Sequence, residues 1–218
     1  MPLITAITPH ARRAGRFDVE LEGDETLTLS DEAVVRLGLR AGARLDDASL
    51  DAVRRCSVEV HTLDRALDML AFRSRAAREL RRSLIRKGEP AEAVDAVIPR
   101  LIAAGLLDDA QYARQLARSK LTGKGFSRRR LATELFKRGV ERDVAEEAIA
   151  DVVREEEVDE QAMLEAVARR QVGRLAALDA LSRRRRLYAF LARRGYASDD
   201  IRRVLRRVLG DEGPSPAE

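Results

Sequence analysis

Basic residues near the expected starts of helices are the side chains in this sequence best suited to chemistry, and that chemistry is the binding of polyanions. Ser127 and Ser182 each precede a run of arginines, and a looser basic group stands at the matching place upstream. Cations at a helix N-terminus oppose the helix macrodipole, at a cost of roughly a few tenths of a kcal/mol each. A repeated local cost suggests a use, such as holding phosphates or the carboxylates of a protein. The candidate binding residues are Arg73, Arg75, Arg78, Lys120, Lys124, Arg128, Arg129, Arg130, Arg183, Arg184, Arg185 and Arg186.

These cations also have a plainer interpretation, in which they form a solvated helix face and pair with Glu134 or other nearby acids. Their position relative to the leucines helps to rank them. Arg128 lies three residues before Leu131 and shares its side of the helix, so it is expected to be partly packed. The arginines expected to point away from the leucines, and so to make contacts, are Arg129, Arg130, Arg185 and Arg186.

The other candidates for chemistry are isolated. His10 and His61 have no partner pattern, and Cys56 has no CxxC or histidine motif near it, so surface or core roles are expected for all three. The Gly-Lys-Gly stretch at 123–125 lacks the first glycine and the preceding strand of a phosphate-binding P-loop. The acidic residues of 155–160 lack the turn glycine of a calcium loop and favour a solvated junction. We therefore expect no catalytic residue, no metal and no cofactor.

The composition is typical of a folded protein with long, charged helices. Of the 218 residues, 45% are hydrophobic, 36% are charged and 4% are aromatic, which suits exposed helices with narrow apolar stripes. Residues 1–60 hold 8 Lys/Arg and 11 Asp/Glu, whereas residues 61–210 hold 33 and 23, so the positive charge lies on the later part. A basic helical array suggests a polyanionic partner, nucleic acid first, although arginine can also merely keep helices soluble.

Location and assembly follow from simple features of the sequence. One cysteine allows no intramolecular disulfide. Neither a hydrophobic signal segment nor an apolar run long enough for a bilayer is found. We expect a cytoplasmic monomer with no membrane partner.

Three copies of one pattern divide the helical part of the chain. In each copy a leucine stands eight and four residues before a glycine, and a basic residue stands just before that glycine. Leucines four residues apart share a helix face, and glycine after basic residues is a usual helix stop. An apolar stripe follows each glycine, so each copy predicts a helical hairpin that stacks on its neighbours to bury its leucines. The three glycines, each expected at positive φ, are Gly88, Gly139 and Gly195.

These patterns predict a mainly α protein, with tandem three-helix-type repeats stacked into an elongated, curved array behind a small β-rich N-terminal module. Ser30, Ser74 and an aspartate of the pair Asp108-Asp109 are expected as helix N-caps, and residues 122–125 as a flexible break. Strands are expected at 3–8, 16–21, 26–29 and 57–60, and early helices at 31–37 and 47–55. The expected divisions are the module at 1–61, repeats at 62–108, 109–158 and 159–210, and a disordered tail at 211–218.

Residues 62–210 resemble the RecX family. The resemblance is carried by several motifs in a fixed order, each weak alone and fairly specific together. The dense arginine run of the last repeat departs from the family pattern, and the N-terminal module lies outside the shared helical core. The motifs are Ala66-Leu67-x-x-Leu70 with Arg73, Glu79, Leu80, Leu84, Lys87 and Gly88; Gly105-Leu106-Leu107-Asp108-Asp109-x-x-Tyr112-Ala113; Lys124-Gly125-x-x-Arg128-x-x-Leu131-x-x-Glu134-Leu135-x-x-Arg138-Gly139-Val140; and Leu191-x-x-Arg194-Gly195-Tyr196 with Ile201 and Val204.

The resemblance implies a regulator of the RecA recombinase that is not an enzyme. Such a protein is expected to bind in the helical groove of the RecA–single-stranded DNA filament. It is expected to suppress strand exchange, ATP hydrolysis and the co-protease activity that triggers the SOS response. A stack of helical hairpins with a basic face agrees with this expectation. The alternative is a stand-alone helical DNA-binding protein, but the helix expected at 141–153 is rich in acids that DNA would repel.

Overall fold

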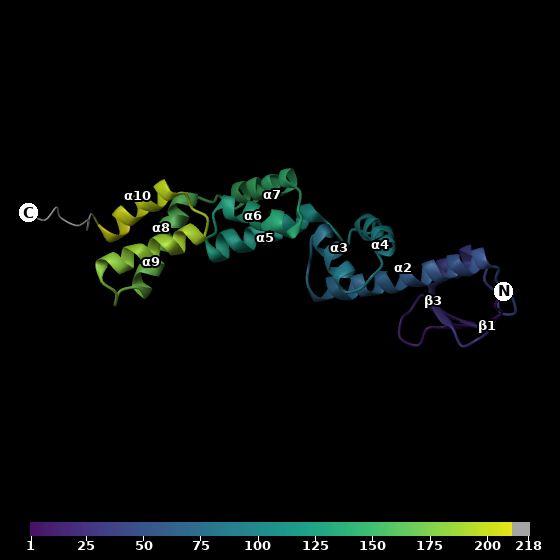
Figure 1. Cartoon of the computed structure of the whole chain (residues 1–218). Helices are drawn as coiled ribbons and strands as arrows, with labels where there is room; N and C mark the ends of the chain where they lie inside the picture. The colour runs from purple at the N-terminus through teal and green to yellow at the C-terminus, as the bar shows by residue number, and fades with distance from the viewer. Residues whose placement is uncertain (211–218) are drawn as a thin grey trace, which may run out of the picture. The chain divides into compact units, whose positions relative to one another are not determined.

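The computed structural model describes residues 1–210, so the disordered tail predicted for 211–218 lies outside the described residues. The chain divides into two compact units, Met1–Leu107 and Asp108–Glu218. Helices predominate, and a small antiparallel sheet opens the chain (Figure 1). The predicted mainly α fold with an N-terminal β module is therefore confirmed.

Three antiparallel strands form the sheet, in the order β1-β2-β3. Alternation along the second strand buries Val19 and Leu21 and leaves Glu20 exposed between them. Ile4 and Leu29, from the outer strands, complete this side of the core. Each strand begins and ends within one residue of its predicted bounds; they are β1 (Ile4–Pro9), β2 (Arg16–Leu21) and β3 (Thr26–Ser30).

Two helices follow the sheet. Ser30 caps α1 (Asp31–Arg36) as predicted, because its hydroxyl oxygen accepts from the N–H of Ala33 at 3.1 Å. Helix α2 (Asp47–Phe72) is one continuous helix of 26 residues, and the strand predicted at 57–60 is wrong.

The error at 57–60 has a simple cause. The alternating valines of that segment also fit a helix, because Val53 and Val60 lie seven residues apart on one face and both are buried. No glycine or proline interrupts residues 47–72. The division expected between residues 61 and 62 therefore falls inside α2, which packs both on β3 and on α4.

The first repeat combines the later turns of α2 with α3 (Ala77–Arg86) and α4 (Ala91–Ala103). Its leucine stripe is buried against α2 and α4, and Gly88 has a φ of 92° as predicted. The cap predicted at Ser74 is wrong: Ala76 is the N-cap and makes no side-chain hydrogen bond. Because Ala76 is fully buried, packing rather than local capping sets where this helix begins.

The second repeat consists of α5 (Asp109–Lys124), α6 (Arg128–Arg138) and α7 (Arg142–Glu155). An aspartate caps α5 as predicted: of the pair it is Asp108, which accepts from the N–H of Gln111 at 2.9 Å. The break predicted at 122–125 is wrong, because α5 continues through Lys124 and only Gly125 leaves it, with a φ of 60°. A glycine inside a helix costs only about 1 kcal/mol, and the buried Leu121 anchors this last turn.

The leucines of α6 behave as their spacing predicts. Leu131 and Leu135 are fully buried, and α7 presents Ile149 and Val152 as its own buried stripe. Gly139 ends α6 in the left-handed conformation, with a φ of 96°. This confirms the helix–glycine–helix pattern on which the repeat was recognised.

The third repeat consists of α8 (Glu160–Arg174), α9 (Ala180–Arg193) and α10 (Ser198–Leu209). Leu187 and Leu191 are fully buried, and Gly195 has a φ of 87° as predicted. The expected equivalence of Ser182 and Ser127 does not hold. Asp179 caps α9, accepting from the N–H of Ser182 at 2.8 Å, so Ser182 lies inside the helix.

Candidate functional site

Three hydrogen bonds to backbone carbonyls hold the N-terminal end of α6 against the turn between α9 and α10. The N–H of Ser127 donates to the carbonyl of Arg194 at 3.1 Å, and Nε of Arg194 donates to the carbonyl of Lys124 at 3.0 Å. The hydroxyl of Tyr196 donates to the carbonyl of Gly125 at 3.1 Å in a buried position. The second and third repeats therefore share one local framework, which positions the basic residues on both.

Two glycines make this close approach possible. At Gly195 a Cβ would stand 2.6 Å from both Cβ of Arg130 and Oγ of Ser127. At Gly125 a Cβ would stand 2.4 Å from Cγ2 of Val167. Both glycines also have positive φ, which other residues adopt at a cost. The left-handed glycines thus serve packing between repeats as well as helix termination.

Burial raises the pKa of Tyr196 above its ordinary value, and the negative charge of Glu160 adds to this effect despite an opposing contribution from Arg194. The phenol therefore stays protonated and remains a donor to Gly125 across the physiological range.

The arginine run at the start of α6 divides into partnered and free side chains. Ser127 caps the helix, its hydroxyl accepting from the N–H of Arg130 at 3.2 Å. Arg128 is exposed rather than packed, and its Nε lies 3.4 Å from a carboxylate oxygen of Glu160. Arg129 is exposed and has no ion-pair partner among residues 1–210. Of this run, Arg129 has the charge most available to a ligand.

Lys120 and Arg130 meet at Phe126. The ammonium of Lys120 lies 5.4 Å from the ring centroid, and the guanidinium of Arg130 lies 5.9 Å from it. Lys120 also lies 3.6 Å from Glu134. Burial alone would raise the pKa of Glu134, but the contacts with Arg138 and Lys120 outweigh it, so the pKa lies below its usual range. One interpretation of the candidate cations was that they pair with Glu134 or other nearby acids. Lys120 does pair with Glu134.

The four arginines of α9 also differ from one another. Arg183 donates from one terminal nitrogen to the carbonyls of Leu178 at 2.8 Å and Ala176 at 3.3 Å, so it closes the turn before its own helix. Arg184 is half-buried. The exposed pair, with no acidic partner among the described residues, is Arg185 and Arg186.

Part of the basic group of the first repeat pairs with one carboxylate, that of Glu79. Arg73 and Arg75 both contact Glu79, the latter at 3.3 Å. Arg78 is exposed on α3. The first unit thus neutralises part of its predicted basic group internally.

A second basic cluster contains one predicted binding residue, Lys124, and three arginines that the sequence did not single out. Lys124 lies with Arg170, Arg174 and Arg194 around a cavity of about 500 Å³, which we call the cationic cavity. The spacing of four between Arg170 and Arg174 was a visible signal for a shared helix face. Their convergence with Lys124 and Arg194 was not visible, because it depends on how the second and third repeats stack.

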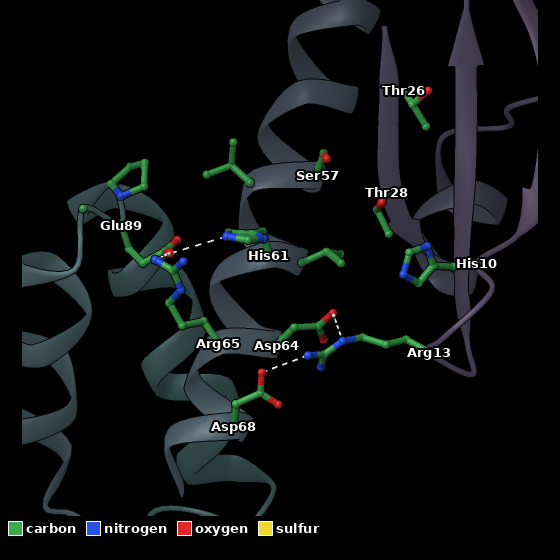
Figure 2. A pocket seen from close by; sticks show the side chains of 14 residues that line it. His10, Arg13, Thr26, Thr28, Ser57, His61, Asp64, Arg65, Asp68 and Glu89 are labelled. Atoms are coloured by element: carbon green, nitrogen blue, oxygen red, sulfur yellow. Dashed lines mark hydrogen bonds and ion pairs between the residues drawn. The ribbon is translucent and has the colours of Figure 1, made fainter. Parts of the chain in front are cut away.

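The polar cavity of the first unit holds the two histidines and is drawn in Figure 2. Arg13, from the loop between β1 and β2, reaches Asp68 on α2 at 2.9 Å, which ties the sheet to that helix. The buried Glu89 accepts from the hydroxyl of Thr62 at 2.6 Å and forms an ion pair with Arg65 at 2.7 Å, as the turn before α4 meets α2. Because its charged groups are paired with one another, this cavity joins elements rather than offering a reactive group.

His10 and His61 of this cavity are likewise beside acids. Nδ1 of His10 lies 2.9 Å from Asp18, and Nε2 of His61 lies 3.7 Å from Glu89. Across residues 1–210, no group of three or more His, Cys, Asp or Glu is arranged to hold a metal ion. Nor is any helix in that part of the chain long and apolar enough to cross a membrane.

The repeats match three consecutive family models. RecX, first three-helix domain, matches residues 63–101; RecX, second three-helix domain, matches 108–149; and RecX, third three-helix domain, matches 158–205. These matches fall on the three helical repeats and leave the N-terminal sheet outside.

Curated proteins named Regulatory protein RecX are similar to this chain. The one from Amycolatopsis mediterranei (strain U-32) is 37% identical over 146 residues, which cover 67% of this chain and 82% of that protein. The one from Thermobifida fusca (strain YX) is 34% identical over 157 residues, covering 70% and 83% respectively.

Solved structures share the fold. The crystal structure of regulatory protein RecX aligns with a TM-score of 0.72 and 19% identity, covering 97% of this chain and all of that one. That of RecX from Lactobacillus salivarius aligns with a TM-score of 0.55 and 17% identity, covering 69% and 96%. With the three domain matches and the identity to curated relatives, these similarities establish that the chain belongs to the RecX family.

Proposed function

We propose that this protein binds the filament that the RecA recombinase forms on single-stranded DNA and inhibits its strand exchange, ATP hydrolysis and co-protease activity. Membership of the RecX family supports this proposal. The observation that carries it furthest is a set of exposed cations in the second unit without carboxylate partners among the described residues. They are Arg129, Arg170, Arg174, Arg185 and Arg186.

Ion pairs with acids neutralise the arginines of α5. On the α5–α7 side, Arg114 lies 2.9 Å from Asp151, and Arg118 lies 2.7 Å from both Glu155 and Glu156. The acids of α7 therefore neutralise the arginines of α5. Much of the uncompensated charge lies on α6, α8 and α9, where a polyanionic filament surface or DNA strand gains from contact.

The alternative of a stand-alone DNA-binding protein has less support. A helix-turn-helix reader places its second helix in the major groove. In the second repeat that helix is α7, where Arg142 is already paired with Glu146 at 2.8 Å and Asp143 stands in the first turn. DNA phosphates repel such an acidic helix. We therefore favour a protein that acts on a protein–DNA filament as a monomeric, cytoplasmic regulator without enzymatic activity.

The test compares two full-length variants that lose the same charge. One carries Arg129, Arg130, Arg185 and Arg186 each changed to Ala. The matched control carries Ala at four exposed arginines that pair with acids on their own helices: Arg142, Arg154, Arg169 and Arg202.

Both variants are assayed for filament binding and for inhibition of RecA ATP hydrolysis at physiological salt, after circular dichroism confirms their folds. We expect the first to lose binding and inhibition and the control to keep them. If the first variant matches the parent in both assays, these arginines are only a solvated face. If the unmodified protein neither binds the filament nor slows ATP hydrolysis, the proposed function is wrong.

A further inference from the structure

The cationic cavity brings four positive side chains together without an acidic one. Lys124 stands at the end of α5, Arg170 and Arg174 on α8, and Arg194 just after α9. Like charges four residues apart on a helix repel each other, at a cost of roughly a few tenths of a kcal/mol. No carboxylate lines the cavity to offset that repulsion.

Arg194 is held in a fixed orientation at the cavity wall. Its guanidinium lies 3.9 Å from the ring centroid of Phe190, and its Nε donates to the carbonyl of Lys124 at 3.0 Å. The terminal nitrogens of this guanidinium have no partner among residues 1–210. They form a pre-oriented pair of donors of the kind that binds phosphate or carboxylate in a bidentate manner.

Among residues 1–210, Arg194 has no carboxylate beside it to offset the effect of burial on its pKa. Burial lowers the pKa of Arg194, and the charges of Arg193 and Arg174 lower it further, together outweighing an opposing contribution from Tyr196. Arg138, which is similarly buried but contacts Glu134, has a raised pKa. An anion bound in the cavity would raise the pKa of Arg194, as Glu134 raises that of Arg138.

The nearest acid on α8 is used elsewhere. Glu165 lies 2.5 Å from Arg169 and 3.6 Å from Arg207 of α10. Two arginines thus share one carboxylate outside the cavity, while Arg170 and Arg174 within it have none.

Thr122 and Gln171 add polar groups to the cavity, and part of its remaining wall is apolar. Met163 and Val167 come from α8, Leu121 from α5, and Phe190 from α9. A volume of about 500 Å³ exceeds what a lone phosphate fills and lies within the range of sites for nucleotide-sized ligands. The cavity therefore combines a cationic side for a phosphate with an apolar side for a sugar and base.

We propose that the cationic cavity binds a phosphodiester of single-stranded DNA, with the adjoining sugar and base against Met163 and Val167. This rests on the proposed function, because the strand would be the one within the RecA filament. A flexible single strand can place both a phosphate and an unstacked base in a recess, whereas a duplex keeps its bases paired. Carboxylates of the RecA surface would satisfy the cations but leave the apolar wall unused.

The experiment measures binding of full-length protein to labelled oligodeoxythymidylate over a range of salt concentrations. The cavity variant is Arg170→Gln with Arg174→Gln. Its matched control is Arg169→Gln with Arg202→Gln, which removes two charges that are paired with Glu165 and Asp199 outside the cavity. Thermal unfolding followed by circular dichroism checks that both variants remain folded.

We expect the cavity variant to bind oligodeoxythymidylate roughly tenfold more weakly at low salt, with the control unchanged. The slope of log affinity against log salt should fall by about 0.7, the value for one single-strand phosphate. An abasic oligomer should bind the parent more weakly than oligodeoxythymidylate, and the cavity variant should discriminate less between the two.

The outcomes separate this inference from the function it rests on. Unchanged affinity and salt slope in the cavity variant would overturn the inference, whatever the filament assays give. Retained DNA binding with lost inhibition of RecA ATP hydrolysis would assign the cavity to acidic protein surface and also overturn it. If the parent binds oligodeoxythymidylate through the cavity but not the filament, the inference holds and the proposed function fails.

Discussion

Gly195 lies so close to Ser127 that a Cβ at residue 195 would stand 2.6 Å from the Ser127 hydroxyl oxygen. The same Ser127 caps α6 and donates its N–H to the carbonyl beside that glycine. One contact therefore joins the start of a helix in the second repeat to the end of a helix in the third.

Replacing Gly195 with Ala should destabilise the protein by about 2 kcal/mol or more, because backbone strain at a φ of 87° adds to the clash with Ser127 and Arg130. Gly88 is the matched control, since its φ is 92° but a Cβ there meets nothing within 4 Å. Gly88→Ala should cost only about 1 kcal/mol. Denaturant unfolding measures both, and equal losses would contradict a packing role for Gly195.

Replacing Ser127 with Ala should cost about 1 kcal/mol, because the N–H of Arg130 loses its capping oxygen. In the third repeat the corresponding loss should come from Asp179→Ala rather than Ser182→Ala, since Asp179 is the cap of α9. Comparison of the three variants by chemical denaturation tests the assignment. A larger effect at Ser182 than at Asp179 would show that the helix begins later than described.

Replacing Tyr196 with Phe should destabilise the protein by about 1 kcal/mol or more. The change removes the donor to the buried carbonyl of Gly125 and leaves that oxygen unsatisfied. Because the pKa of Tyr196 is raised, alkaline titration followed by tyrosine absorbance should show a late-ionising phenol that disappears in the variant. If the amplitude lost in the variant instead belongs to a phenol that ionises in the ordinary range, the Tyr196 phenol is not buried in solution.

The pairing of Asp151 should appear in the acid stability of the protein. Hydrogen bonds from Arg114 and Arg154 lower the pKa of Asp151 below its ordinary value. Its contribution to stability is thus complete above the unfolded-state pKa of about 3.9 and is lost as the pH falls through the lower folded-state pKa.

The measurement is the denaturation midpoint as a function of pH. In Asp151→Asn, the midpoint at neutral pH should be reduced and its fall below about pH 4 should be shallower than in the parent. The control is Asp24→Asn in the hairpin turn, a residue with no ion-pair partner among those described. An identical acid profile for parent and Asp151→Asn would contradict the pairing with α5.

The sequence by itself determined the repeat and its local chemistry. Leucines four residues apart before Gly139 and Gly195 identified the buried helix faces, because a helix places such residues on one side whatever surrounds it. The positive φ of these glycines followed from the same reasoning. The N-terminal strands were predictable because alternation with charged residues leaves few other structures possible.

Tertiary structure decided where helices begin without strong caps and which charges are free. Residues 57–60 join α2, and α3 begins after buried Ala76 rather than at Ser74. Arg128 and Arg129 are neighbours in the sequence, yet only Arg128 reaches Glu160. The cationic cavity joins Lys124 to Arg194, 70 residues later. Local periodicity determines which face of a helix is buried. The electrostatic environment of a cavity depends on side chains from several helices, and only the packing of those helices brings the side chains together.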